Sequence, residues 1–471
     1  MSDLMLSKDP LVTVYILNYN YAAYLKGCID SVLLQSYGNC EIFVIDDGST
    51  DKSKEILSEY AGDDRLSVIF QDNIGLIRSI SKAFLMANGK YIVRVDADDW
   101  IAPNFIEKLV ARIDDDENIA MVFPDYYEVD ESGHLLHRIK RHDFATEVTL
   151  LDQPAHGACT LTRKSAYFDV GGHNQKLQCQ DGVDIWLALT EKYKVANLKE
   201  PLFYYRKHSR SLTTNHDKIL RNRSLIYRDH AVRRGYKTEA LIAFIPVREE
   251  LVVENEFVLL EIAGKSLLQW TIEKALNSDL VTDIVISTDS DKLETYIYKN
   301  SEMYDGKEVK VHKRSKGLAS QGVHIDESIR DFFKTYEYDF DGSIAILTPD
   351  YPFSTHAHID SAMYYGYLFN VDVVDTVLED NSIMYFHNGK GLVELFDGEI
   401  RHERDNVYIR KGGITLYRKE YIQFIRSQIK QEAIVRGHIV VDKYSSFEVK
   451  SIEDVLIADY IACNILGMVH D

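Results

Sequence analysis

Short apolar runs alternate with amphipathic stretches in this chain, and the alternation occurs twice. In the first half, the apolar runs include residues 11–17 and 91–95, and the segments between such runs have apolar residues at helical spacing. Strands of this length joined by helices need right-handed crossovers, which build a mostly parallel sheet. The pattern restarts at residues 241–247 and continues through residues 283–289. The sequence therefore predicts two α/β domains, each with its own sheet.

The stretch between the two patterns is basic, although the whole chain is acidic. The chain has 54 Lys and Arg against 74 Asp and Glu, a formal net charge of −20, but residues 215–235 contain six basic and two acidic residues. Apolar residues with helical spacing in this stretch predict a basic linker helix. Its basic face is either solvated or in contact with an anionic surface. We predict a first domain at residues 1–214, the linker at 215–238 and a second domain at 239–471.

Composition excludes several classes of protein. Apolar residues make up 45% and charged residues 27%, which is typical of a soluble globular chain. A net charge of −20 would repel a long phosphate backbone, so no nucleic-acid partner is expected. Five cysteines without paired spacing argue against a disulfide framework or a zinc site. Without an export signal or an apolar run of about 20 residues, we expect a cytoplasmic protein with no transmembrane segment, with a peripheral position at the inner face of a membrane as an option.

An acidic turn follows the apolar run at residues 41–45. Asp46 and Asp47 precede Gly48, which permits a tight turn, and Asp51 is one of the residues that can cap the next helix. Ligands of open parallel sheets bind beyond the carboxyl ends of the strands. One aspartate could therefore accept hydrogen bonds from a base or a ribose, but ordinary turn chemistry explains the same residues without a ligand.

A second acidic cluster, Asp96, Asp98 and Asp99, follows the run at residues 91–95. Alternation along an extended segment places Asp96 and Asp98 on one side, and hard oxygen ligands suit Mg²⁺ or Mn²⁺. Neighbouring carboxylates repel one another, so a cation or an ordered turn must offset that repulsion. The cluster predicts either a metal whose shell a diphosphate completes or an acidic turn.

Three segments taken together resemble the opening of family 2 glycosyltransferases, which have the GT-A fold of nucleotide-diphospho-sugar transferases. The segments are LNYNYAAYLKGCIDSVLLQSY, DDGSTDKS and DNIGLIRSISKAFLMANGKYIVRVDADDW, in this order. The resemblance spans roughly residues 10–215. It implies transfer of a sugar from a nucleotide-sugar donor, with inversion at the anomeric carbon. The implied acceptor is a glycan, a lipid-linked molecule or a protein in the synthesis of a surface polysaccharide or glycoconjugate.

The resemblance also implies contacts for individual residues. Asp47 would contact the nucleoside. Arg206 and His208 form an Arg-x-His element that could neutralise phosphate, and a neutral His208 could ligate a metal, with a packed or surface histidine as the alternative. The implied donor contacts are Tyr19, Asn20, Asp47, Arg78, Asp96 and Arg206. The implied ligands of a Mn²⁺ or Mg²⁺ ion are Asp96, Asp98, Asp99 and His208.

Residues 156–189 look like the acceptor half of this family. In similar sequences, the aspartate of a Glu-Asp or Gln-Asp pair before an aromatic-rich helix is the general base, and Gln180-Asp181 is such a pair. Inversion by a single displacement needs one carboxylate to take the proton of the acceptor hydroxyl. Asp181 is therefore the predicted catalytic base, and a helix N-cap is the alternative role.

The second half resembles sugar-acid cytidylyltransferases, which make CMP-activated nonulosonic acids. The resemblance covers roughly residues 241–465, with matches at IPVR (245–248), AGKSLLQWTIEKAL (263–276) and KGGITLYRKE (411–420). It implies a second α/β domain of the cytidylyltransferase-like class. Related nucleotidyltransferases commonly pair, so a homodimer through this domain is a further expectation.

Two departures from that family fall where its chemistry should be. After Arg248 the family has a loop of the Gly-Ser-Lys-Gly type, whose backbone amides bind a triphosphate, but this chain has Glu249 and Glu250. The Asp-x-Asp metal element of the family aligns with Glu448-Val449-Lys450. We therefore predict a degenerate domain with a role in assembly, substrate recruitment or regulation.

Two other functions remain open alongside an inverting, metal-dependent glycosyltransferase. One is a bifunctional enzyme whose second domain also makes a CMP-sugar acid. The other is a carbohydrate-binding scaffold without catalysis. The leading hypothesis rests on a geometric expectation, namely that the acidic clusters around Asp47, Asp98 and Asp181 meet in a single cleft.

Overall fold

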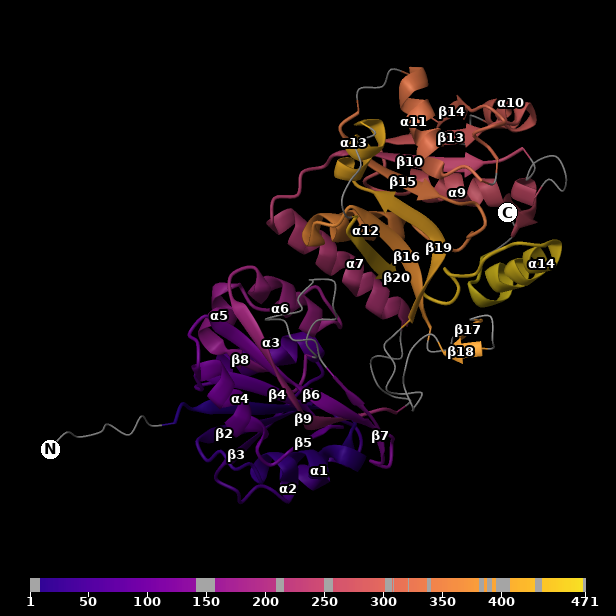
Figure 1. Cartoon of the computed structure of the whole chain (residues 1–471). Helices are drawn as coiled ribbons and strands as arrows, with labels where there is room; N and C mark the ends of the chain where they lie inside the picture. The colour runs from indigo at the N-terminus through magenta and orange to yellow at the C-terminus, as the bar shows by residue number, and fades with distance from the viewer. Residues whose placement is uncertain are drawn as a thin grey trace. The chain divides into compact units, whose positions relative to one another are not determined.

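The structure is a computed structural model, and it describes residues 9–140, 157–208, 216–249, 257–300, 307, 309–320, 322–336, 340–380, 385–387, 392–394, 407–427 and 434–468. The chain divides into two compact units; in Figure 1 the first runs from indigo to magenta and also includes the orange strands labelled β17 and β18, and the rest, from magenta to yellow, is the second. The first unit ends at Ile226 and includes the described residues between 383 and 405; the second contains Tyr227–Ser382 and Asn406–Asp471. The division falls within helix α7 (His216–Arg233), which occupies the basic stretch. The predicted domain boundaries stay a prediction.

The first unit contains a nine-stranded sheet in the order β3-β2-β1-β4-β8-β6-β9-β5, with β7 paired to β6. Strands β1 to β4 are parallel. β1 is buried along its whole length, as a central strand covered on both faces should be. The strands are β1 (Val12–Asn18), β2 (Cys40–Asp47), β3 (Leu66–Gln71), β4 (Tyr91–Asp96), β5 (Trp100–Ile101), β6 (Ile119–Val129), β7 (Leu135–Ile139), β8 (Leu161–Arg163) and β9 (Lys194–Arg206). β17 (Tyr385–His387) and β18 (Leu392–Glu394) form a separate antiparallel pair.

Helices cover both faces of this sheet. On one face, Val14 and Ile16 of β1 pack in a common core with Leu25 and Phe105, which belong to two amphipathic helices. The opposite face carries Tyr15, whose ring meets a helical phenylalanine edge to face. The helices of the first unit are α1 (Ala22–Leu33), α2 (Ser53–Ser58), α3 (Leu76–Met86), α4 (Phe105–Asp114), α5 (Lys164–Asp169), α6 (Asp181–Thr190) and the first part of α7.

The parallel register aligns the acidic turns at one edge of the sheet. Asn18 at the end of β1 pairs with Asp46 of β2, and Leu17 pairs with Asp96 of β4. Neighbouring strands lie about 4.8 Å apart. The turns after β2 and β4 therefore flank the end of β1, where ligands of open α/β sheets bind.

The second unit has a seven-stranded sheet in the order β14-β13-β10-β15-β19-β16-β20, in which β14, β13, β10 and β15 are parallel. Its strands are β10 (Ala240–Val247), β13 (Asp283–Thr288), β14 (Val309–Lys313), β15 (Gly342–Leu347), β16 (Val373–Asp380), β19 (Val407–Tyr417) and β20 (Arg436–Val440), with a short β11 (Glu261–Ile262) and β12 (Lys265–Ser266) pair. Its helices are α9 (Leu267–Leu276), α10 (Asp291–Lys299), α11 (Ile325–Tyr336), α12 (His356–Phe369), α13 (Lys419–Ser427) and α14 (Ile452–Tyr460), with short helical turns η2 (Phe257–Leu259) and η4 (Ile461–Ile465). The prediction of two α/β sheets is confirmed. Among the described helices, none combines the length and apolar character that crossing a bilayer requires.

Lys274 of α9 is a buried ammonium group in the second unit. It is 4% exposed, and its Nζ donates to the carbonyl of Tyr351 at 3.0 Å and to Ser354 Oγ at 2.5 Å. Burial lowers the pKa of Lys274 to about 7, although the nearby Asp350 carboxylate opposes the shift. The protonated form of Lys274 therefore destabilises the folded unit.

This burial predicts a pH dependence of stability. Unfolded lysine has a pKa of about 10.4, so between pH 7 and 10 the unfolded chain binds a proton that folded Lys274 has lost. The free energy of unfolding should rise with pH over this range, by at most about 1.4 kcal/mol per pH unit. Lys274→Met should remove this rise of the unfolding free energy with pH, whereas Lys265→Met, at a partly exposed ammonium, should retain it. Urea-dependent hydrogen exchange in peptides from α9 measures the unfolding free energy of each variant. Equal pH slopes for wild type and Lys274→Met would contradict the prediction.

Candidate functional site

The turn after β2 is built on a buried carboxylate. Asp46 is fully buried, and its Oδ2 accepts a hydrogen bond from Asn18 Nδ2 at 2.7 Å. The backbone N–H of Ser49 donates to Asp46 Oδ1 at 3.0 Å, and Asn18 Nδ2 also reaches Ser49 Oγ at 3.0 Å. These bonds satisfy a buried charge. Asp46 therefore fixes the turn, whereas Asp47, which is also buried, makes its contacts with a different loop.

Asp47 holds the loop that leads into α3. Its Oδ1 accepts hydrogen bonds from Gln71 Nε2 at 2.7 Å and from the Ile74 N–H at 3.0 Å, and its Oδ2 accepts one from the Gly75 N–H at 3.0 Å. Gly48, at φ +80°, lets the two loops approach, because a Cβ there would lie 2.8 Å from a backbone nitrogen of the facing loop. A nucleoside contact of Asp47 stays a prediction, and this network would orient its carboxylate.

The other predicted donor residues of this edge differ in their surroundings. Asn20 lies in the left-handed region at φ +61°, and its Oδ1 accepts the N–H of Thr50 at 2.8 Å, so it ties the end of β1 to the turn after β2. Tyr19 is 48% exposed beside it. Arg78 is exposed in the first turn of α3. Tyr19 and Arg78 therefore have side chains that a ligand could reach.

Asp98 and His208 come together from distant parts of the chain. His208 Nε2 lies 2.9 Å from Asp98 Oδ2, and the imidazole is almost fully buried. The ring stacks on Tyr24 of α1 and meets Tyr21 edge to face. Both side chains are thus held at the edge where β4 and β9 end.

Arg206 fixes the turn that carries Asp98 and Asp99. Its backbone N–H donates to Asp99 Oδ1 at 2.9 Å, and its Nε donates to the Asp98 carbonyl at 2.9 Å. The guanidinium lies over the rings of Tyr24 and Trp100. Burial raises the pKa of Asp99 well above its usual value, and the negative charge of Asp98 adds to this. The other oxygen of Asp99, Oδ2, is buried without a hydrogen-bond partner among the described residues.

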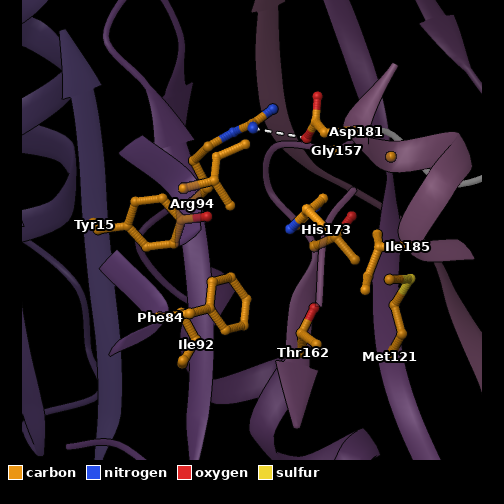
Figure 2. Close-up of a pocket in the computed structure, with 13 residues that line it drawn as sticks. Tyr15, Phe84, Ile92, Arg94, Met121, Gly157, Thr162, His173, Asp181 and Ile185 are labelled. Carbon is orange, nitrogen blue, oxygen red and sulfur yellow. Dashed lines mark hydrogen bonds and ion pairs between the residues drawn. The ribbon is translucent and has the colours of Figure 1, made fainter. Parts of the chain in front are cut away.

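Arg94 links Asp96 to the predicted base. It lies on β4 and is 5% exposed, with Nε 2.9 Å from Asp96 Oδ1 and Nη1 2.8 Å from Asp181 Oδ2 (Figure 2). Burial raises the pKa of Asp96 to about 6; Arg94 opposes this rise, whereas the charges of Asp98 and Asp181 add to it. Asp96, Asp98 and Asp181 are therefore electrostatic neighbours at one edge of the sheet.

Arg94 was not among the residues predicted from the sequence. The signal was a cation inside the apolar strand YIVRVD, two positions before Asp96 and therefore on the same side of the strand. A small pocket lies beside it, between the sheet and helices α3 and α6. Its lining includes Tyr15, Phe84, His173 and Asp181, which Figure 2 shows around the ion pair.

The predicted metal ligands do not form one ready-made cluster. Within the parts of the chain that the structure describes, no three His, Cys, Asp or Glu side chains group in a way that could hold a metal ion. Asp98 and His208 do lie together, whereas Asp96 faces Arg94 and one oxygen of Asp99 faces a backbone N–H. Asp98 Oδ2 and the buried, unpartnered Asp99 Oδ2 are hard oxygen atoms of the kind that Mg²⁺ and Mn²⁺ prefer, so a metal here would need further ligands from a bound molecule.

In the second unit, lysines neutralise the carboxylate where the resemblance implied a metal. Glu448 Oε2 lies 2.5 Å from Lys411 Nζ and 2.9 Å from Lys450 Nζ. Burial alone would raise the pKa of Glu448, but these two ammonium groups outweigh burial and lower that pKa below its usual value. The Glu249 side chain pairs with Lys316, and Glu250 lies outside the described residues.

Two family models match the chain. The model described as Glycosyl transferase family 2 matches residues 13–171, and the model described as Cytidylyltransferase matches residues 257–448. An uncharacterized glycosyltransferase of Haemophilus influenzae is 30% identical over 228 residues, which cover 44% of this chain and 69% of that protein. The hyaluronan synthase of Pasteurella multocida is 28% identical over 202 residues, 42% of this chain and 21% of that protein. The crystal structure of TarS residues 1–349 from S. aureus has a TM-score of 0.40 and 18% identity, covering 48% of this chain and 66% of that one.

The first unit is an α/β domain of the GT-A type with an acidic edge, and the second is a separate α/β domain of the cytidylyltransferase-like class. The chain belongs, through its first half, to glycosyltransferase family 2. Both resemblances read from the sequence are thereby confirmed. The chain spans only about a fifth of the length of the hyaluronan and chondroitin synthases of Pasteurella multocida that it matches.

Proposed function

We propose that this protein is an inverting glycosyltransferase that moves a sugar from a nucleotide-sugar donor to a glycan, lipid-linked or protein acceptor. The observation that carries the proposal is the Arg94 ion pair, which brings the family's acidic strand end and the candidate base Asp181 to one edge of the sheet. The names of its relatives, hyaluronan synthase and chondroitin synthase, support a glycan product and hence a role in surface polysaccharide or glycoconjugate synthesis.

In the proposed reaction, Asp181 takes the proton of the acceptor hydroxyl as its oxygen attacks the anomeric carbon. The bond between that carbon and the donor diphosphate breaks at the same time, with inversion, and the electron pair leaves on the phosphate oxygen. One oxygen of Asp181 faces Arg94, and the Asp181 carboxylate is the group to which we assign the acceptor proton.

The donor would lie beyond the ends of β1, β2 and β4. Tyr19 offers an exposed aromatic ring to the nucleobase of the donor, and Asp47 offers the nucleoside a carboxylate that the loop before α3 orients. Arg78 could reach the phosphates from the first turn of α3. Asn20 and Arg206 would act by holding the surrounding turns, through Thr50 and through the carbonyl of Asp98.

A divalent cation, Mn²⁺ or Mg²⁺, completes the proposal. Asp98 and His208 would hold it, with Asp99 Oδ2 and Asp96 as further oxygen ligands. When bound, such an ion stabilises the negative charge that develops on a departing diphosphate. The described residues also supply their own stabilisation of the acidic edge, because Arg94 and Arg206 lie on either side of it.

For the second unit, we propose a domain that has lost nucleotidyl transfer. The ion pairs of Glu448 with Lys411 and Lys450 support the loss, since two ammonium groups occupy the surroundings of the carboxylate. One observation favours some retained ligand binding. Arg314, which follows β14, is 5% exposed, and its Nε and Nη2 have no hydrogen-bond partner among the described residues. Assembly, recruitment or regulation, with a homodimer as one form of assembly, are the roles we propose for it.

The base assignment predicts a specific loss. With UDP-glucose, UDP-galactose, UDP-N-acetylglucosamine, UDP-glucuronate and GDP-mannose as a donor panel, Mn²⁺ and mixed oligosaccharide acceptors, at least one donor should release its nucleotide. Asp181→Asn should lower kcat by about 10²- to 10⁴-fold and change nucleotide affinity much less, because the proposed nucleoside contacts, Tyr19 and Asp47, lie on other segments of the chain. Asp184→Asn is the matched control, since Asp184 is a buried carboxylate of the same helix that accepts the Asn174 N–H. Failure of every donor, or equal activity of the two variants, would refute the proposal.

Removal of the metal should weaken nucleotide binding. Calorimetry with UDP and GDP in Mn²⁺ should show affinity at least about tenfold higher than in EDTA, equivalent to about 1.4 kcal/mol. Asp98→Asn and His208→Gln should each lose most of this difference. His134→Gln, at an exposed imidazole paired with Asp130, should keep it. A metal dependence that survives Asp98→Asn would contradict the ligand assignment.

The second unit should not release pyrophosphate. Incubation of the whole chain with CTP, N-acetylneuraminate and Mg²⁺, followed by a coupled pyrophosphatase assay, should give no signal above the protein-free rate. The physical reason is that Lys411 and Lys450 already neutralise Glu448. Pyrophosphate release that Arg314→Met abolishes, with the family 2 half unchanged, would establish the bifunctional alternative instead.

A further inference from the structure

The guanidinium of Arg94 is withdrawn from water within a sheet of apolar side chains. Its strand, β4, is buried over its first five residues, and the Arg94 side chain is 5% exposed. A buried charge costs several kcal/mol unless partners of opposite sign and good geometry surround it. The stability of the first unit therefore requires that the partners of Arg94 stay where they are.

Two carboxylates from different parts of the fold serve as these partners. Asp181 comes from the start of α6, 87 positions along the chain from Arg94, and accepts a hydrogen bond from Nη1 at 2.8 Å. Asp96 comes from the same strand, two residues on; its Oδ1 lies 2.9 Å from Nε as an ion pair, without a hydrogen bond at Nε in the described part of the chain. The charges of Asp181 and Asp96 raise the pKa of Arg94, whereas burial opposes this rise. One guanidinium thus contacts both carboxylates.

The surrounding backbone leaves this ion pair little room to move. A Cβ on Gly157 would lie 2.4 Å from Asp181 Oδ2 and 3.0 Å from Arg94 Nη2, so any larger residue there would push the ion pair aside. Gln180, just before Asp181, adopts a left-handed conformation at φ +65°, which turns the chain into α6. Figure 2 shows Tyr15 on the side of Arg94 away from Asp181.

We propose that Arg94 is a positioning residue that holds the base Asp181 and the donor-side Asp96 at a fixed separation. One guanidinium then orients the acceptor side and the donor side of the site together. The inference rests on the proposed glycosyl transfer, because only that reaction assigns Asp181 and Asp96 to opposite substrates.

The chemistry of the pair explains why arginine stands at this position. Arginine presents several N–H donors in a rigid plane and can meet two carboxylates at once, whereas lysine offers a single ammonium. Without the cation that both contact, the neighbouring charges of Asp96 and Asp181 would repel each other. We expect Asp181 to rotate away from its present position in that case.

The test compares Arg94→Lys and Arg94→Met with Arg163→Met. Arg163 is a matched control, because it is also a buried arginine of the same sheet, but it donates to the backbone carbonyls of Ile119 and Ile113. Using the panel donor that wild type turns over fastest, kcat of Arg94→Met should fall about a hundredfold or more. The fall in Arg94→Lys should be smaller. Arg163→Met, measured on folded protein, should stay within about threefold of wild type in kcat.

Two readouts separate positioning from general destabilisation. UDP and GDP affinity of Arg94→Met, measured by calorimetry in EDTA, should change less than its kcat does, because the nucleoside contacts lie elsewhere on the edge. A crystal structure of Arg94→Met should show the Asp181 carboxylate displaced, and added guanidinium chloride at millimolar concentration should restore part of the activity of Arg94→Ala.

The outcomes distinguish the two proposals. If wild type turns over a donor but Arg94→Met keeps kcat within threefold of wild type or matches Arg163→Met, the positioning role is wrong and the glycosyltransferase proposal stands. An unmoved Asp181 in the variant crystal also overturns the positioning role. If wild type turns over no donor, the proposed function fails, and the inference fails with it.

Discussion

Charge withdrawn from water governs the edge of the first sheet. Asp46, Asp99 and Asp181 are buried, and the Asp96 side chain is 28% exposed. Each of the four carboxylates meets a donor or a cation: Asn18 for Asp46, Arg94 for Asp96 and Asp181, and the Arg206 backbone for Asp99. Because an unmatched buried carboxylate would be strongly destabilising, folding of this edge and assembly of the site are the same event. The parallel register supplies the framework, since it brings the ends of β1, β2 and β4 to one level. The carboxylate of Asp47, held by two backbone N–H groups, then orders the loop before α3.

The second unit neutralises its partly buried carboxylate with lysine side chains. Its carboxylate Glu448 is neutralised by Lys411 and Lys450, so the chain itself provides the positive charge at this position. Lys274, by contrast, is buried against neutral oxygens, and burial lowers its pKa to about 7. The two units therefore share a class of fold but not a distribution of charge, and fold alone does not transfer a function from one to the other.

Much of the architecture could be predicted from the sequence, because both sheets leave a periodic signal. The apolar runs at residues 11–17 and 241–247 form the interior strands β1 and β10. The acidic clusters, expected just after strands, begin within the last residues of β2 and β4. The different roles of Asp46 and Asp47 could not be predicted, since both end the same strand and only tertiary contacts with Asn18 and Gly75 separate them. Arg94 was missed for the same reason. Its partner Asp181 lies 87 positions away, and only the packing of α6 on the sheet brings them together.

The Arg94 network also decides how substitutions at this site should combine. Asp96, Asp181 and Arg94 share contacts, so removal of one member changes the environment of the other two, and free-energy changes at such positions do not add. Loss of Arg94 leaves the carboxylates of Asp96 and Asp181 without their shared cation, whereas loss of Asp181 leaves Arg94 with Asp96 alone. Substitution of Asp181 should therefore lower kcat by a smaller factor in a protein that already lacks Arg94 than in the wild type. The acceptor side and the donor side would then respond as one unit, although they belong to α6 and β4 and to opposite substrates.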